Sequence, residues 1–194
     1  MTDRQDAEGA AAQDEQLVTA DWRSTADLID GVVVHEVRNV VTRNGITTEV
    51  FRQDWGIAAG EVTHAIHVHF RAGAISAWHS HKEKTDHLFV VAGLLRAVLY
   101  DDREGSPTRG MLNELYLSHS RPQLVVIPPR VFHGLQALGS DPAAFVNYFD
   151  RLYEYADPDD HRLPQKKLRR PVEQPEMVAL AAALPGALAR ARAR

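Results

Sequence analysis

The feature that most constrains the fold is a series of short apolar stretches, rich in β-branched residues, that starts near Gly31. The stretches are separated by turn signals at Asn44-Gly45, Ala72-Gly73, Ala92-Gly93, Asp101–Gly105, Arg121-Pro122 and Gly139–Pro142. Many short strands at such spacing are typical of a sandwich or barrel of antiparallel strands. The sequence therefore predicts an all-β domain.

The segment from Glu61 to Phe70 shows the alternation of a strand most clearly. One parity holds Val62, Ile66, Val68 and Phe70, and the other holds Thr63, His67 and His69. Residues two apart on a strand share a face. His67 and His69 are therefore candidates for a shared substrate-binding face, and the alternative is a polar outer face of the sheet.

Composition divides the 194 residues into three segments. Residues 1–16 are polar and acidic, which predicts a disordered N-terminal tail. Residues 17–160 form the expected barrel domain, with a candidate short helix over 19–30. Residues 161–194 form a basic, Ala/Arg-rich tail, and we expect part of 177–194 to be helical despite Pro185-Gly186.

Charge and composition exclude several classes of protein. The net charge of −4 combines +6 in residues 161–194 with −10 in the remainder, and an acidic body argues against nucleic-acid binding. The sequence contains no run of about eighteen apolar residues, which is the length that would predict a membrane span. No signal peptide is visible at the N-terminus. With no cysteine in the chain, disulfides and Cys-ligated metals are excluded, and we expect a cytoplasmic protein.

Three histidines and an aspartate carry the chemistry of the sequence. His79 and His81 lie two apart, so on a strand their imidazoles point to one side. Asp86 follows after a short turn, and His133 follows the rigid Pro128-Pro129. Imidazoles and a carboxylate suit iron, manganese, nickel, copper or zinc, so these four residues are candidate ligands of a divalent transition metal.

The spacing of these residues resembles the two signature motifs of the cupin superfamily. The first motif matches at Gly73, His79, His81 and Gly93, with Asp86 where glutamate is usual, and the second matches at Pro128 and His133. The resemblance implies a jelly-roll barrel, also called a double-stranded β-helix, with short helical or disordered ends. It also implies that His79, His81, Asp86 and His133 converge inside that barrel.

Within this superfamily the chain resembles the dTDP-4-dehydrorhamnose 3,5-epimerases. The resemblance rests on Gly31-Val32, Asn44-Gly45, Glu49–Arg52, Asp102–Thr108, Leu117-Ser118, Ile127–Pro129 and His133-Gly134. It implies that His79 removes a proton beside a sugar ketone. Tyr153 is the best match to the acid on the opposite face, ahead of Tyr148 and Tyr155. It further implies a homodimer without an organic cofactor, and Arg52 is a candidate contact of the sugar or diphosphate.

Two further observations leave alternatives open. His79-Ser80-His81-Lys82 is similar to the His-Ala-His-Lys motif of the dTDP-4-keto-6-deoxyhexose 3,4-ketoisomerases, which also move protons beside a ketone. Ser76 and Asp86 stand where the epimerases have an arginine and a lysine, and a metal would restore positive charge there. The alternatives are a metal-dependent cupin acting as dioxygenase or isomerase on a small polar substrate, and a non-catalytic binding cupin.

Overall fold

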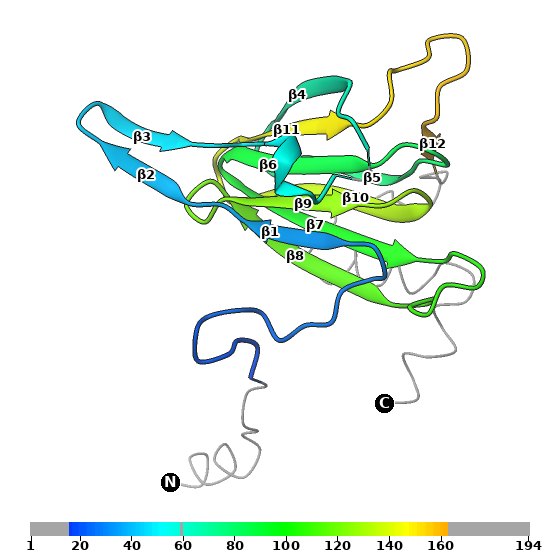
Figure 1. Ribbon diagram of the computed structural model, residues 1–194, viewed down its shortest axis with the longest axis horizontal. Coiled ribbons are helices and arrows are strands. Elements are labelled where there is room, and N and C mark those ends of the chain that lie inside the picture. Colours follow the sequence, from blue (N-terminus) through cyan, green and yellow to red (C-terminus); the bar gives the residue numbers. More distant parts are fainter. Residues whose placement is uncertain (1–15, 59, 163–194) are drawn as a thin grey trace, which may run out of the picture.

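The computed structural model describes residues 16–58 and 60–162, and within them strands dominate (Figure 1). The elements are β1 (Val33–Glu36), β2 (Asn39–Thr42), β3 (Gly45–Thr48), the 3-10 turn η1 (Gln53–Trp55), β4 (His64–Phe70), β5 (Ile75–Ser80), β6 (Asp86–Ala92), β7 (Leu94–Asp101), β8 (Leu112–Ser118), β9 (Gln123–Ile127), β10 (Val131–Leu138), β11 (Ala143–Phe149) and β12 (His161–Arg162). The described residues contain no α-helix, so the helix expected over 19–30 is wrong. An isolated bridge between Val18 and Ser24 lies there instead.

Two antiparallel sheets form the barrel. One has the strand order β1-β9-β6-β11-β4 and the other has the order β12-β5-β10-β7-β8. Apart from the consecutive pair β7 and β8, strands that neighbour each other in these two sheets are not consecutive in the chain, as expected for a barrel built from Greek-key connections. This arrangement confirms the predicted all-β, jelly-roll cupin fold.

The apolar core fills the space between the two sheets. Strand alternation points Leu95, Ala97 and Leu99 of β7 inward, where they pack with Leu88 and Val90 of β6. Leu95 and Leu99 are completely buried. Polar side chains replace apolar ones toward the end of the barrel where β6 begins, and this change positions the site described below.

The β2–β3 hairpin projects away from the barrel (Figure 1). The predicted Asn44-Gly45 turn joins the two strands, and Gly45 has the positive φ of 137° that favours glycine. Val41 and Ile46 lie opposite each other in its ladder, yet they are 80% and 67% exposed. The hairpin therefore carries apolar surface that the described part of this single chain leaves uncovered.

The barrel extends slightly past its predicted boundary at residue 160. His161 and Arg162 form β12, which pairs with Ser80 and His79 of β5. The predicted tails over 1–16 and 161–194, including the helix over 177–194, otherwise lie almost wholly outside the described residues. Among the residues described, no helix has the length and apolar character needed to cross a membrane.

Candidate active site

A cavity of about 580 Å³ opens at the end of the barrel where β4 and β6 begin and β11 ends. Both sheets contribute to its wall. Its polar lining includes His64, Ser76, His79, His81, Asp86, His133 and Asn147, and its apolar lining includes Ile66, Val68, Phe70, Leu135, Phe145 and Phe149. A cavity of this size with an apolar wall and convergent polar groups is typical of a small-molecule site.

His81, Asp86 and His133 form a close buried group at the base of the cavity. Their ligand atoms lie within 4.8 Å of one another. Asp86 Oδ2 is 3.4 Å from His81 Nε2 and 4.0 Å from His133 Nε2. The Nδ1 atoms contact backbone oxygens, of Asp159 at 2.6 Å for His81 and of Val131 at 3.3 Å for His133. These contacts turn both Nε2 atoms toward Asp86.

Charge is distributed unevenly within this group. Burial raises the pKa of Asp86, but the charge of His133 and the hydrogen bonds from His81 and Asn147 outweigh it, giving a pKa of about 2. Burial lowers the pKa of His81, yet its bond to Asp86 outweighs that effect and raises the pKa overall. Burial lowers the pKa of His133. The group thus favours an ionised Asp86, whose carboxylate in turn favours the charged form of His81.

His79 stands next to this group without belonging to it. Its ring stacks on that of His133 with 5.8 Å between centroids, because His79 and His133 are register partners in β5 and β10. Its Nε2 lies 2.8 Å from Ser76 Oγ. Burial, with the charges of His133 and Arg162, lowers the pKa of His79 to about 4. His79 is therefore neutral near pH 7 and can accept a proton.

Tyr153 enters the cavity from the loop that follows β11. Its side chain lines the cavity with Tyr155, and the two rings are 5.0 Å apart. Tyr148 is not part of this wall; its ring stacks on Phe51 at 5.1 Å instead. Of the three tyrosines considered from sequence, Tyr153 and Tyr155 reach the cavity.

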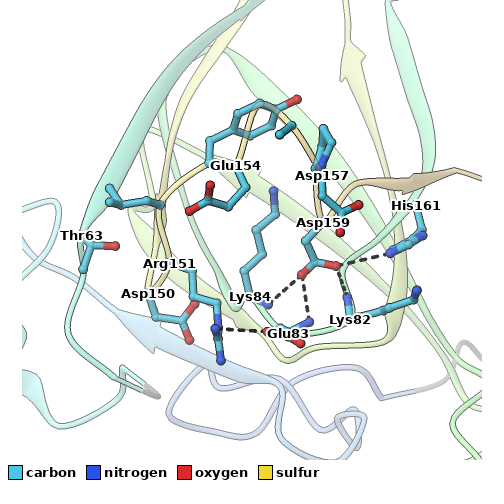
Figure 2. A pocket seen from close by; sticks show the side chains of 14 residues that line it. Thr63, Lys82, Glu83, Lys84, Asp150, Arg151, Glu154, Asp157, Asp159 and His161 are labelled. Carbon is cyan, nitrogen blue, oxygen red and sulfur yellow. Dashed lines mark hydrogen bonds and ion pairs between the residues drawn. The ribbon is translucent and has the colours of Figure 1, made fainter.

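The loop over residues 150–160 is held against the barrel by two adjacent aspartates. Asp159 accepts backbone N–H bonds from Lys82, Glu83 and Lys84 at 2.7 to 3.1 Å (Figure 2). Asp160 Oδ1 lies 3.1 Å from Lys84 Nζ and 3.2 Å from His81 Nδ1. A second cavity of about 670 Å³ is lined by residues of this loop and of the turn before β6, and Lys84, Arg151 and Tyr153 line both cavities. The loop thus forms a wall between them.

Three predicted substrate contacts do not reach the cavity. His67 and His69 lie exposed on the other face of β4, because Ile66, Val68 and Phe70 of the apolar parity face the barrel interior. Arg52 is exposed and forms ion pairs with Glu49 at 2.9 Å and Asp54 at 2.6 Å. Within the described part of this single chain, Arg52, His67 and His69 therefore do not line this cavity, and their role as substrate contacts stays a prediction.

Other residues of the cavity were missed by sequence reasoning. His64 shares the parity of Ile66 and lines the cavity, a position that the alternation of β4 could have revealed. Lys84, Arg151 and Arg162 also line it. They lie on a turn, a loop and a two-residue strand, where no periodic pattern indicates direction.

The comparisons with known proteins agree with this geometry. The model of the dTDP-4-dehydrorhamnose 3,5-epimerase family matches residues 26–169. A probable low-salt glycan biosynthesis epimerase of Haloferax volcanii is 34% identical over 137 residues, covering 70% of this chain and 88% of the relative. The spore coat polysaccharide biosynthesis protein SpsL of Bacillus subtilis is 31% identical over 143 residues, covering 71% of this chain and 90% of the relative.

A solved structure gives the same result. The crystal structure of a dTDP sugar isomerase from Desulfovibrio desulfuricans is 28% identical, with a TM-score of 0.67 over 73% of this chain and 90% of that chain. The family match covers well over half of the sequence and includes every strand that lines the cavity. The chain belongs to the dTDP-4-dehydrorhamnose 3,5-epimerase family and is a cupin of the deoxysugar epimerase type.

Proposed function

We propose that this protein epimerises a nucleotide-linked 4-keto-6-deoxy sugar at a carbon next to the ketone. The observation that carries the proposal is the placement of a neutral imidazole, His79, and a phenol, Tyr153, on the wall of one cavity. Epimerisation needs a base to remove the proton and an acid to return one from the opposite face. General acid–base groups of this kind each contribute roughly 10²- to 10⁴-fold.

The reaction follows from these two groups. His79 accepts the proton from the carbon beside the ketone, and the electrons of that C–H bond form a C=C bond while the ketone becomes an enolate. Tyr153 then donates its hydroxyl proton to the other face of the same carbon. Ser76 Oγ, 2.8 Å from His79 Nε2, fixes the orientation of the imidazole.

Two arginines support a nucleoside diphosphate as the handle of the substrate. Arg151 and Arg162 line the cavity, and both are exposed at its rim. Guanidinium groups bind phosphate through paired hydrogen bonds. In this proposal, these two residues take the role of phosphate contact that was expected of Arg52.

The test is solvent exchange. The protein is incubated in deuterated water with a dTDP-4-keto-6-deoxyhexose, and deuterium at the carbons next to the ketone is followed by NMR. Wild type should label at least one of these positions and His79→Gln should label at the uncatalysed rate. Equal labelling by both proteins, or none by wild type across several such sugars, would sink the proposal.

A metal centre is the second candidate, supported by the spacing of His81, Asp86 and His133. Donor atoms about 2 Å from a common ion lie roughly 3 to 3.5 Å apart, and the 3.4 Å and 4.0 Å separations approach that spacing. The backbone contacts of both Nδ1 atoms leave Nε2 free to ligate. A divalent ion held there would polarise the ketone oxygen as a Lewis acid.

Elemental analysis of protein purified without a tag separates the two candidates. Stoichiometric transition metal that disappears in His81→Ala, together with turnover, would favour the metal-dependent enzyme. Metal-free protein with full exchange activity would favour the epimerase proposal, in which a protonated His81 beside Asp86 provides the local positive charge. Nucleotide-sugar binding without exchange would identify a binding cupin.

We also propose that the protein is a homodimer, formed through the β2–β3 hairpin. Val40, Val41 and Ile46 are 58%, 80% and 67% exposed on an element that projects from the barrel. Apolar surface of this kind, on a hairpin with unpaired edges, is stabilised by contact with a second copy.

A further inference from the structure

The outer face of β4 carries two histidines that the cavity does not use. His67 and His69 lie two residues apart on this strand, so their side chains leave it on the same side. Both are exposed, and their rings meet edge to face with 5.2 Å between centroids. The other histidines of the described chain that contact one another all line the cavity, and these are His79, His81 and His133. The pair on β4 is therefore a separate cluster of metal-ligating side chains.

The position of β4 at the edge of its sheet leaves this pair open to solvent. Among the described strands, β4 pairs only with β11, where Val146 is opposite His67 and Ala144 is opposite His69. Both neighbours are apolar, so neither competes for an imidazole nitrogen. Among the described residues, no hydrogen bond or ion pair reaches either ring. The ring nitrogens of both histidines are therefore available to a ligand.

The separation of the two rings fits two ligands of one metal ion. Imidazole nitrogens bind Zn²⁺ at about 2.0 to 2.1 Å, usually in tetrahedral geometry. Two imidazoles that bind one tetrahedral ion at that distance hold their ring centroids roughly 5 Å apart. The observed separation is 5.2 Å. The strand therefore already places the rings at the separation that a shared ion requires.

We infer that His67 and His69 form a binding site for a divalent transition metal ion on the outside of the barrel. One nitrogen of each ring ligates the ion, which can be Zn²⁺, Ni²⁺ or Cu²⁺, since imidazole suits all three. Water completes the coordination, because Val146 and Ala144 supply no third ligand. No described residue fixes the second nitrogen of either ring, so the ion exchanges readily with solvent. This inference does not depend on the proposed epimerisation.

Calorimetric titration of chelator-treated protein with Zn²⁺ tests the site. The double variant His67→Ala, His69→Ala should bind one Zn²⁺ fewer per chain than wild type, whether or not the group in the cavity holds an ion of its own. Each single substitution should weaken binding at this site by roughly 100-fold, the order of the gain from linking two binding groups. His119→Ala removes an exposed histidine from the turn after β8 and should bind like wild type.

Moving the pair along the strand tests its geometry. Ala65 lies two residues before His67 on the same exposed face. Ala65→His combined with His69→Ala rebuilds a pair two residues apart, and this variant should regain the Zn²⁺ ion that His69→Ala loses. Ala65→His combined with His67→Ala has the same number of histidines, but they are four residues and about 13 Å apart along the strand. This control should not regain the ion.

Paramagnetic Cu²⁺ locates the bound ion, because it broadens NMR signals of nearby amides. The signals of Val146 and Ala144 should broaden in wild type and stay sharp in the double variant. An unchanged number of bound ions in the double variant, or equal recovery by the two variants that carry Ala65→His, overturns the site. All these substitutions lie at exposed positions, and thermal unfolding checks that each variant folds. If the double alanine variant does not fold, His67→Gln with His69→Gln makes the same comparison.

Discussion

At the residue scale, three histidines of the site have different protonation behaviour although they lie side by side. His81 contacts the carboxylate of Asp86, which raises its pKa, whereas the pKa of His79 falls to about 4 because it is buried next to other cations. Adjacent groups whose environments separate their pKa values can take different roles. His79 is suited to accept a proton and His81 to carry charge.

Tyr153→Phe should separate the two proton transfers. His79 can still remove the proton and return deuterium to the face from which it came, so exchange should continue while formation of the epimer falls roughly 100-fold or more. NMR of the sugar ring distinguishes labelled substrate from epimer. Tyr155→Phe is the comparison, since Tyr155 is 88% exposed and 5.0 Å away. If Tyr155→Phe blocks the epimer and Tyr153→Phe does not, Tyr155 is the acid.

At the scale of elements, the turn between β7 and β8 is organised by one buried carboxylate. Asp101 accepts bonds from the Arg103 backbone N–H and Nε at 3.0 and 2.9 Å, and from the hydroxyls of Ser106 and Thr108 at 2.6 Å each. Arg103 also binds the carbonyl of Asp30 at 2.7 Å. The turn thereby ties the segment before β1 to the second sheet.

Asp101→Asn should lower the free energy of unfolding by about 2 kcal/mol, since hydrogen bonds to a charged group are worth roughly 1.5 to 3 kcal/mol. Burial raises the pKa of Asp101, but its bonds to Arg103, Ser106 and Thr108 outweigh that effect and hold the pKa below the ordinary 3.8. The stabilisation is therefore complete above pH 3.8 and is lost as the pH falls through the lower folded pKa.

Urea unfolding of both proteins at pH 7 and at successively lower pH checks this prediction. The difference in the free energy of unfolding between wild type and Asp101→Asn should become smaller as the pH is lowered. A difference in unfolding free energy that is constant with pH, or that grows in acid, would show that the carboxylate charge does not stabilise the turn.

At the scale of the whole molecule, the hairpin predicts the assembly. Val41 and Ile46 face each other across the β2–β3 ladder, so lysine at both positions places two charges on one apolar face. The double variant Val41→Lys, Ile46→Lys should shift the solution mass from twice the 21.6 kDa chain to a single chain. Light scattering measures this. Tyr116→Lys changes a 54% exposed side chain on β8 and should leave the mass unchanged.

Much of the fold followed from the sequence because alternation and turn residues are local signals. The spacing of His79, His81, Asp86 and His133 predicted that these residues converge, and all four line one cavity. It also grouped His79 with the candidate metal ligands, whereas the close group contains only His81, Asp86 and His133 among the described residues. The sequence did not show which face of β4 points inward. Both faces of that strand carry histidine, and only the packing of the assembled barrel turns the apolar face inward. Lys84 and Arg151 sit in irregular segments, where side-chain direction depends on long-range contacts such as Asp159 and Asp160.

The attachment of residues 150–160 has a consequence for how this site can change. One short segment supplies Tyr153, positions Lys84 through Asp160 and contacts His81 through Asp159. The barrel strands supply His79, Asp86 and His133. The site is therefore modular: replacing this one segment would change Tyr153, the contacts of Lys84 and the environment of His81 in one event, while His79 on its barrel strand stayed in register.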